Sequence, residues 1–135
     1  MPAASGWVVT LLCVIALCSG CSSLGSDLSQ AGSAAKDFHT ALAGSEPAAA
    51  CELLAPGTLK GLEESAGASC PKALAEAQLP DAVTVTLADV YGTNARVVLE
   101  GDTVFLARFG SQWKVTAAGC KPRAGLPYDC AVKGP

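Results

Sequence analysis

The chain has 135 residues, seven cysteines and a net charge of −3, which is enough for one compact domain with its own core. The mildly acidic balance, without a cluster of basic residues, argues against nucleic acid as a partner. It also offers no electrostatic attraction to anionic lipid headgroups.

Residues 1–20 have the character of an export signal. The uncharged apolar run from Trp7 to Leu17 is too short for a membrane-spanning helix, which needs about 20 apolar residues. A run of this length fits the hydrophobic region of a signal peptide. Residues 1–20 contain neither Lys nor Arg, so the positive segment that usually opens such a signal is missing.

Cys21 ends the stretch Leu17-Cys18-Ser19-Gly20-Cys21, which resembles the lipobox of bacterial lipoproteins. Ser19 and Gly20 fit that pattern, whereas Cys18 stands where the family prefers Leu. The resemblance implies that residues 1–20 are removed and that the Cys21 thiol carries a diacylglycerol, whose two chains suffice for stable anchoring. An ordinary cleaved secretory signal is the alternative. Residues 21–30 are small and polar, and we expect them to form a flexible tether.

Helical spacing governs the next part of the chain. Apolar positions from Ala31 to Leu42 recur every three or four residues and predict a first helix. Three shorter helices are expected to begin near Pro47, Thr58 and Cys70, where prolines or N-cap residues provide start signals.

After Pro80 the apolar period changes to two, which predicts β-strands. Four strands are expected over residues 83–88, 95–100, 104–109 and 113–117, and the short glycine turns between them make antiparallel neighbours. We expect the helices to cover the sheet face that carries Val85, Val97, Phe105 and Trp113. The tail from Lys121 to Pro135 is rich in proline and is expected to be irregular.

Four cysteines remain beyond Cys21: Cys51, Cys70, Cys120 and Cys130. An even number in an oxidising compartment predicts two disulfides, for which three pairings are possible. We expect Cys51–Cys70 and Cys120–Cys130, because each pair lies within one segment of the chain. A metal site is disfavoured, since these four cysteines include no C-x-x-C pair and His39 is the only histidine.

Helices followed by a four-stranded antiparallel meander define one α+β domain over residues 31–135. This order, with the phrases A-A-A-C-E-L-L-A-P, G-D-T-V-F-L-A-R-F and W-K-V-T-A-A-G-C, resembles the NTF2-like (SnoaL-like, cystatin-like) cone fold. Within that fold the chain is similar to small disulfide-bearing lipoproteins of high-GC Gram-positive bacteria. The resemblance implies a cone that encloses a pocket between sheet and helices.

Candidate functional side chains are few. Asp89 and Tyr91 continue the first strand, and at a pocket mouth they would serve as general base and oxyanion donor, as in family members that shift protons next to a carbonyl. The alternative is that both are solvated at a strand end beside a turn. His39 is expected on the flank of the first helix, partly exposed.

The segment between Cys120 and Cys130 offers a second candidate site. Closed by a disulfide, it would present Arg123 and Tyr128 in a preorganised loop that suits contact with a partner. The alternative is a staple that pins the C-terminus to the last strand.

These features together predict a membrane-anchored extracytoplasmic domain without cofactor or metal. We expect a non-enzymatic module that binds a small apolar ligand or another envelope protein. The alternatives are an isomerase- or dehydratase-type enzyme that uses Asp89 and Tyr91, and a purely structural envelope lipoprotein.

Overall fold

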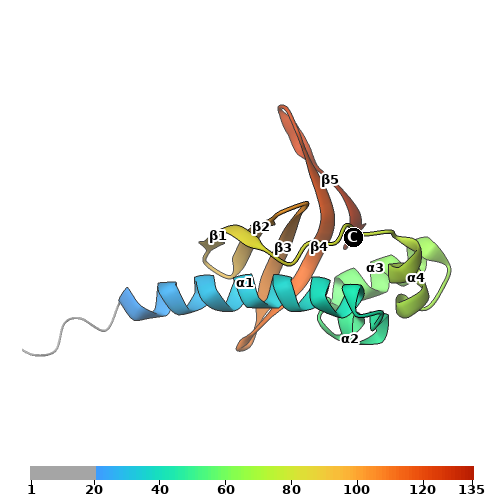
Figure 1. The fold of residues 1–135 in the computed structure, drawn as a ribbon, viewed down its shortest axis with the longest axis horizontal. Helices are drawn as coiled ribbons and strands as arrows, with labels where there is room; N and C mark the ends of the chain where they lie inside the picture. Colours follow the sequence, from blue (N-terminus) through green and yellow to red (C-terminus); the bar gives the residue numbers. More distant parts are fainter. Residues whose placement is uncertain (1–20) are drawn as a thin grey trace, which may run out of the picture.

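The computed structural model describes residues 21–135, so the expected signal at residues 1–20 lies outside the described residues. Figure 1 shows four helices followed by five strands in this part of the chain. The helices are α1 (Cys21–Ala43), α2 (Pro47–Glu52), α3 (Pro56–Ala66) and α4 (Cys70–Glu76). The strands are β1 (Val85–Tyr91), β2 (Asn94–Leu99), β3 (Asp102–Phe109), β4 (Gln112–Arg123) and β5 (Leu126–Lys133).

The strands form a single antiparallel sheet in chain order, β1-β2-β3-β4-β5. The α+β expectation is therefore confirmed, while the expected number of strands was one too low. Within residues 21–135, none of the helices combines the length and the apolar character that crossing a bilayer would need.

Helix α1 corrects the expectation of a flexible tether. Residues 21–30 are its first part, and the helix runs without interruption into the buried positions Ala31, Ala35 and Phe38. Once a packed segment has formed a helix, adding residues to its end costs little, because the expensive nucleation step is already complete. An ion pair between Asp27 and Arg108 of β3 also fixes this early part.

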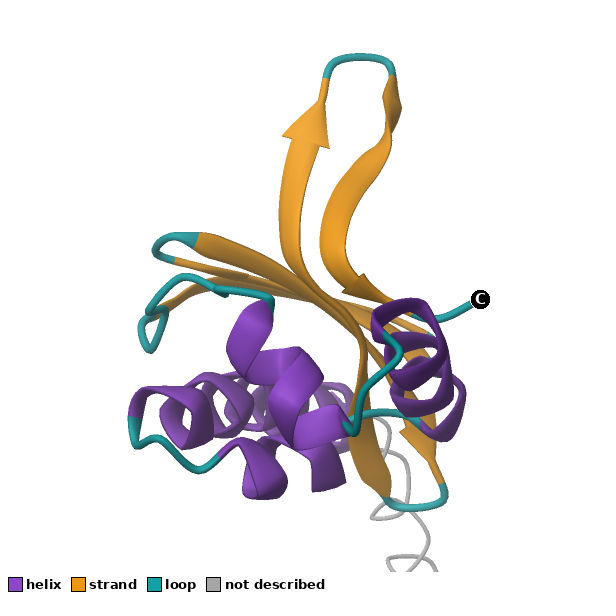
Figure 2. Ribbon diagram, turned by 90° about the vertical axis from the view of Figure 1, so that its right-hand side faces the viewer, coloured by secondary structure: helices purple, strands orange, loops and turns teal. Residues whose placement is uncertain are grey.

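The core lies between α1 and one face of the sheet, which we call the inner face. The helices gather mainly on this side, whereas α3 lies beside the C-terminal end of β5 (Figure 2). The inner face is formed by alternating residues of the strands, including Ala95, Val97, Leu99, Val104, Leu106, Trp113 and Val115.

The opposite sheet face, which we call the outer face, carries a residue that was expected to be inside. Phe105 is the ladder partner of Arg96 and lies one position from the buried Val104 and Leu106, so its side chain is on the outer face. The expectation was wrong because both faces of β3 are apolar, and alternation alone does not say which one faces the helices.

Both expected disulfides are present. Cys51–Cys70 joins α2 to α4, and Cys120–Cys130 joins two residues that face each other across the β4–β5 ladder. The tail is thus not irregular but forms the end of β4 and all of β5. Pro122 lies where the register shifts between Lys121 and Arg123, a place where the sheet does not depend on its missing N–H.

Candidate functional site

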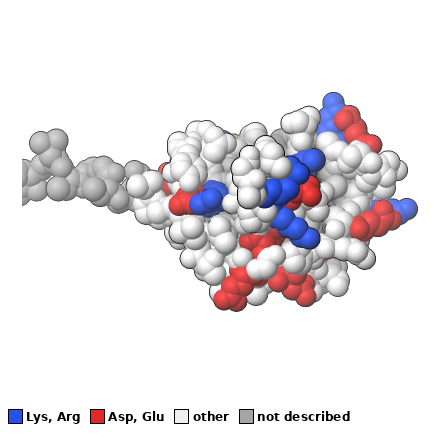
Figure 3. Space-filling view, turned by 90° about the horizontal axis from the view of Figure 1, so that it is seen from above, with Lys and Arg blue, Asp and Glu red and all other residues white. Residues whose placement is uncertain are grey.

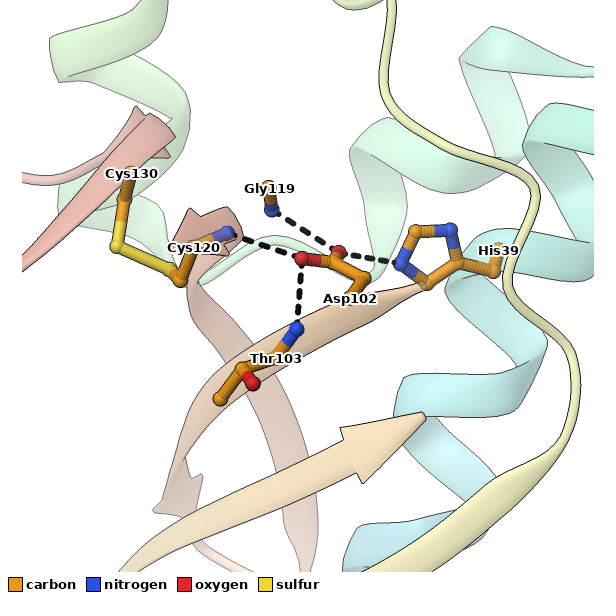
Figure 4. Close-up of polar contacts among 6 residues, drawn as sticks. All are labelled: His39, Asp102, Thr103, Gly119, Cys120 and Cys130. Atoms are coloured by element: carbon orange, nitrogen blue, oxygen red, sulfur yellow. Dashed lines mark hydrogen bonds and ion pairs between the residues drawn. A yellow bond between two sulfur atoms is a disulfide. The ribbon is translucent and has the colours of Figure 1, made fainter. Parts of the chain in front are cut away.

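The most highly connected polar group in the structure is the carboxylate of Asp102, the first residue of β3 (Figure 4). Its Oδ1 accepts hydrogen bonds from the backbone N–H groups of Thr103 at 2.7 Å and Cys120 at 2.9 Å. Its Oδ2 accepts one from the N–H of Gly119 at 3.0 Å and lies 2.8 Å from Nε2 of His39. The side chains of His39 and Asp102 are each only 1% exposed.

Gly119 is the residue that allows two successive N–H groups to reach one carboxylate. In a regular strand, neighbouring N–H groups point in opposite directions. Gly119 has φ +64°, a left-handed conformation that residues with a side chain adopt only at a cost. A Cβ at this position would also lie 2.5 Å from Cδ2 of Leu79 and 3.0 Å from Cβ of Ala131.

His39 corrects the expectation of a partly exposed histidine. It is buried on α1 four residues after Ala35, within the same stripe as Phe38. Because the Asp102 carboxylate accepts hydrogen bonds on both oxygens, we assign the imidazole proton that faces it to Nε2. The Nδ1 atom is buried without a hydrogen-bond partner among the described residues.

The His39–Asp102 pair therefore links α1, the start of β3 and the middle of β4. It has no access to solvent, so we assign it a positioning role rather than contact with a substrate. The sequence held a signal for both residues: His39 continues the helical spacing of Ala31 and Ala35, and Asp102 shares the strand parity of Val104 and Leu106.

From this buried network the β4–β5 hairpin rises away from the body of the protein (Figures 1 and 2). We call residues 119–131 the arm. The Cys120–Cys130 disulfide closes its base, and near the tip the Nε of Arg123 donates a hydrogen bond to the backbone oxygen of Pro127 at 3.1 Å. Leu126 at the tip is 60% exposed.

The two residues expected to form a contact surface have different environments. Arg123 is exposed on the arm, as such a role requires. Tyr128 is half-buried, because its ring packs edge-on against Phe105 of the outer face, with 5.0 Å between ring centroids. Tyr128 thus holds the arm against the sheet, and the free surface of the arm is its tip.

Asp89 and Tyr91 also lie on the outer face, not between the sheet and the helices. The Asp89 carboxylate accepts hydrogen bonds from the Nε and Nη2 atoms of Arg96 at 3.1 and 2.6 Å. Asp89, and after it Tyr128, raise the pKa of the Arg96 guanidinium above its ordinary value, because both interact with its charged form. Tyr91 is 62% exposed. The structure does not bring the two candidates together in a pocket.

The best-formed hollows on the described residues are two open grooves beside α1, with volumes of about 320 and 260 Å³. The first is lined mainly by polar side chains, including Ser33, Asp37 and Lys114, and runs past Trp113. The second lies between α1 and β1 and includes Gly32 and Val85. An enclosed pocket of the kind the cone resemblance implies is not among them.

Within residues 21–135, no group of three or more His, Cys, Asp or Glu side chains is arranged to hold a metal ion. The charged side chains on the face that carries the arm are of mixed sign (Figure 3). Comparison with protein families, with curated proteins and with solved structures finds no match for this chain.

Proposed function

We propose that this protein is a lipid-anchored extracytoplasmic binding domain whose arm contacts another envelope protein. The observation that carries the proposal is the construction of the arm. A projecting hairpin loses conformational entropy when it binds unless it is already ordered. Here the Cys120–Cys130 disulfide, the Arg123–Pro127 hydrogen bond and the hydrogen bonds to Asp102 order it in advance.

The tip of the arm has the chemistry of a contact surface. Leu126 offers an exposed apolar side chain beside the cationic Arg123, in a segment made rigid by Pro122 and Pro127. Arginine is enriched among the few residues that dominate the binding energy of an interface, and the centre of an interface is more apolar than its rim. The open grooves beside α1 give weaker support to an apolar small-molecule ligand, because ligand pockets bury most of the ligand surface.

Two disulfides support an extracytoplasmic location, since such bonds persist in oxidising compartments. The sequence that precedes Cys21 supports this residue as the site of lipidation.

The isomerase- or dehydratase-type alternative is disfavoured by the pairing of Asp89 with Arg96. The guanidinium of Arg96 occupies the carboxylate that a general base would use.

The anchoring part is tested by mass spectrometry of the protein purified from its own membranes. We expect a mature chain that begins at Cys21 and carries a diacylglycerol, and a Cys21→Ala variant that is released or remains unprocessed. A wild-type protein that is unmodified and free of the membrane would refute the anchoring.

The binding part is tested by cross-linking in intact cells, followed by recovery of the protein with its partners. The double variant Arg123→Ala/Leu126→Ala should lose an envelope protein that the wild type recovers. Lys60→Ala/Leu87→Ala, which also removes one exposed cation and one exposed apolar side chain but away from the arm, is the control and should retain it. Equal recovery with the arm variant would leave the purely structural lipoprotein as the better description.

A further inference from the structure

The end of the molecule at which α1 begins has an unusual surface. Asp27 near the start of α1 is bound to Arg108 near the end of β3, with Nη1 and Oδ1 2.9 Å apart. The start of α1 therefore lies at the same end of the sheet as the β1–β2 turn and the β3–β4 turn. We call the three segments at this end, residues 21–30, 91–94 and 109–112, the proximal end.

Large apolar side chains are exposed at the proximal end. Leu24 on α1 is 56% exposed, Tyr91 at the end of β1 is 62% exposed, and Phe109 at the end of β3 is 47% exposed. Tyr91 pairs with Asn94, and Asn94 pairs in turn with Ala107, two residues before Phe109. The two aromatic side chains thus share the outer face, on strands about 10 Å apart.

The proximal end is also almost free of charge. Asp27 is the only charged residue in its three segments, and Arg108 neutralises it. The next charged residue of β1, Asp89, is likewise paired with Arg96. In Figure 3 a small group of acidic and basic side chains lies side by side near the start of α1, and further such groups follow along the molecule.

Helix α1 fixes the distance between Cys21 and the proximal end. A flexible tether would allow the domain to stand away from a membrane, but α1 is helical from Cys21 onward. Leu24 follows Cys21 by about 4.5 Å along the helix axis, and Ala31, where packing on the sheet begins, follows by about 15 Å. A lipid on Cys21 would therefore hold the proximal end at the headgroup region.

We propose that Leu24, Tyr91 and Phe109 form a membrane-contacting surface that seats the domain on the lipid bilayer. This inference rests on the proposed lipidation of Cys21 and adds an orientation to it. Tyr favours the membrane–water interface, where its ring contacts acyl chains and its hydroxyl meets headgroups, and Phe and Leu supply the apolar contacts of interfacial segments. Unpaired charges oppose such contact. The one charged residue in the three segments of the proximal end, Asp27, is paired with Arg108.

The test uses the mature lipidated protein in phosphatidylcholine–phosphatidylglycerol vesicles whose acyl chains carry bromine, a contact quencher of tryptophan. Tyr91→Trp reports on the proximal end, and Leu126→Trp, at an equally exposed apolar position on the arm, is the matched control. The emission of Trp113 is subtracted by using the wild type. We expect about a twofold loss of the added emission for Tyr91→Trp, because interfacial side chains lie about 5–10 Å into this region, and almost none for Leu126→Trp.

Equal quenching of the two variants, or none in either, in protein that floats with the vesicles would overturn the membrane contact while leaving the anchor intact. Protein that does not float would refute the anchor itself. A response of Tyr91→Trp that follows protein density but not bromine would assign the surface to contact between copies and also overturn the proposal.

A second measurement leaves Leu24, Tyr91 and Phe109 unchanged. Amide hydrogen exchange of the lipidated wild type should slow in peptides that contain residues 91–94 and 109–112, relative to the soluble Cys21→Ala protein. Exchange that is unchanged there, or slowed only in the arm, would contradict the proposed orientation.

Discussion

Nε2 of His39 lies 2.8 Å from Oδ2 of Asp102 although the two residues are 63 positions apart in the chain. The contact joins the last part of the long helix to the first residue of β3. Through the same carboxylate it reaches the backbone of Gly119 and Cys120, where the arm begins. The direction in which the arm leaves the body is thus set by a buried polar network and not by the disulfide alone.

Substitution of Asp102 by Ala should be strongly destabilising. It leaves the imidazole N–H of His39 and the backbone N–H groups of Gly119 and Cys120 without their acceptor in a buried place. Removing one partner of a buried pair costs about 3–5 kcal/mol of unfolding free energy. Urea denaturation of Asp102→Ala and of the control Glu100→Ala, an exposed acid in the adjacent turn, checks this. Equal midpoints for the two variants would contradict the role assigned to the carboxylate.

Gly119→Ala should lower stability more than Gly125→Ala, although both glycines have a positive φ. At Gly125, with φ +69°, an added Cβ meets nothing within 4 Å, so only the cost of the left-handed conformation applies, about 1–2 kcal/mol. At Gly119 the Cβ collides with Leu79 and Ala131, which adds about 1–3 kcal/mol.

Thermal and urea unfolding of the two glycine variants measure the difference directly. The comparison isolates the close approach at Gly119, because φ is similar at the two positions, +64° and +69°. Similar losses would mean that Leu79 moves aside and that the packing under the arm is loose.

The fold class and both disulfide pairs could be predicted from the sequence. Both depend on local properties, namely the period of the apolar residues and the closeness of the paired cysteines along the chain. The sequence did not reveal which face of β3 packs against the helices. Val104 and Leu106 alternate with Phe105 and Phe109, so either set could form the core, and only the position of α1 decides between them. Asp102 was missed for the same reason, because its strand parity matters only once Val104 is known to be inside.

The start of α1 and the strand β5 were missed for a different reason. Small polar residues, as in Ser22 to Ser26, are common in linkers, yet they extend a helix when a packed segment follows. Proline is disfavoured in a central strand because it has no N–H to donate, so Pro122 and Pro127 indicate irregular structure. In a projecting hairpin some backbone groups have no ladder partner, and proline is tolerated there. In both cases, contacts from distant residues outweigh the local preference.

Removal of the Cys120–Cys130 disulfide by Cys120→Ser/Cys130→Ser should loosen the arm selectively. Closing a loop of this size stabilises by about 3 kcal/mol in the chain-entropy model. Trypsin should then cleave after Arg123, whereas Lys121 is followed by Pro122 and is a poor site. Peptide mapping after brief digestion provides the measurement.

The matched control for that experiment is Cys51→Ser/Cys70→Ser, which opens the other disulfide, between α2 and α4. It should reduce global stability by a similar amount and leave Arg123 protected under conditions where the protein remains folded. Cleavage after Arg123 in both variants to the same extent would show that the arm is ordered only by global folding.

Asp27→Ala should release the first part of α1 without unfolding the domain. The Asp27–Arg108 ion pair is partly exposed, so its loss costs about 0.2–1 kcal/mol. Because it holds the helix start against β3, the change should appear locally, as about 2- to 5-fold faster amide exchange in residues 24–30. The control is Asp37→Ala, an exposed acid on the same helix, which should leave this exchange unchanged. A uniform rise in exchange along α1 in both variants would mean that the ion pair does not fix the helix at the end nearest Cys21.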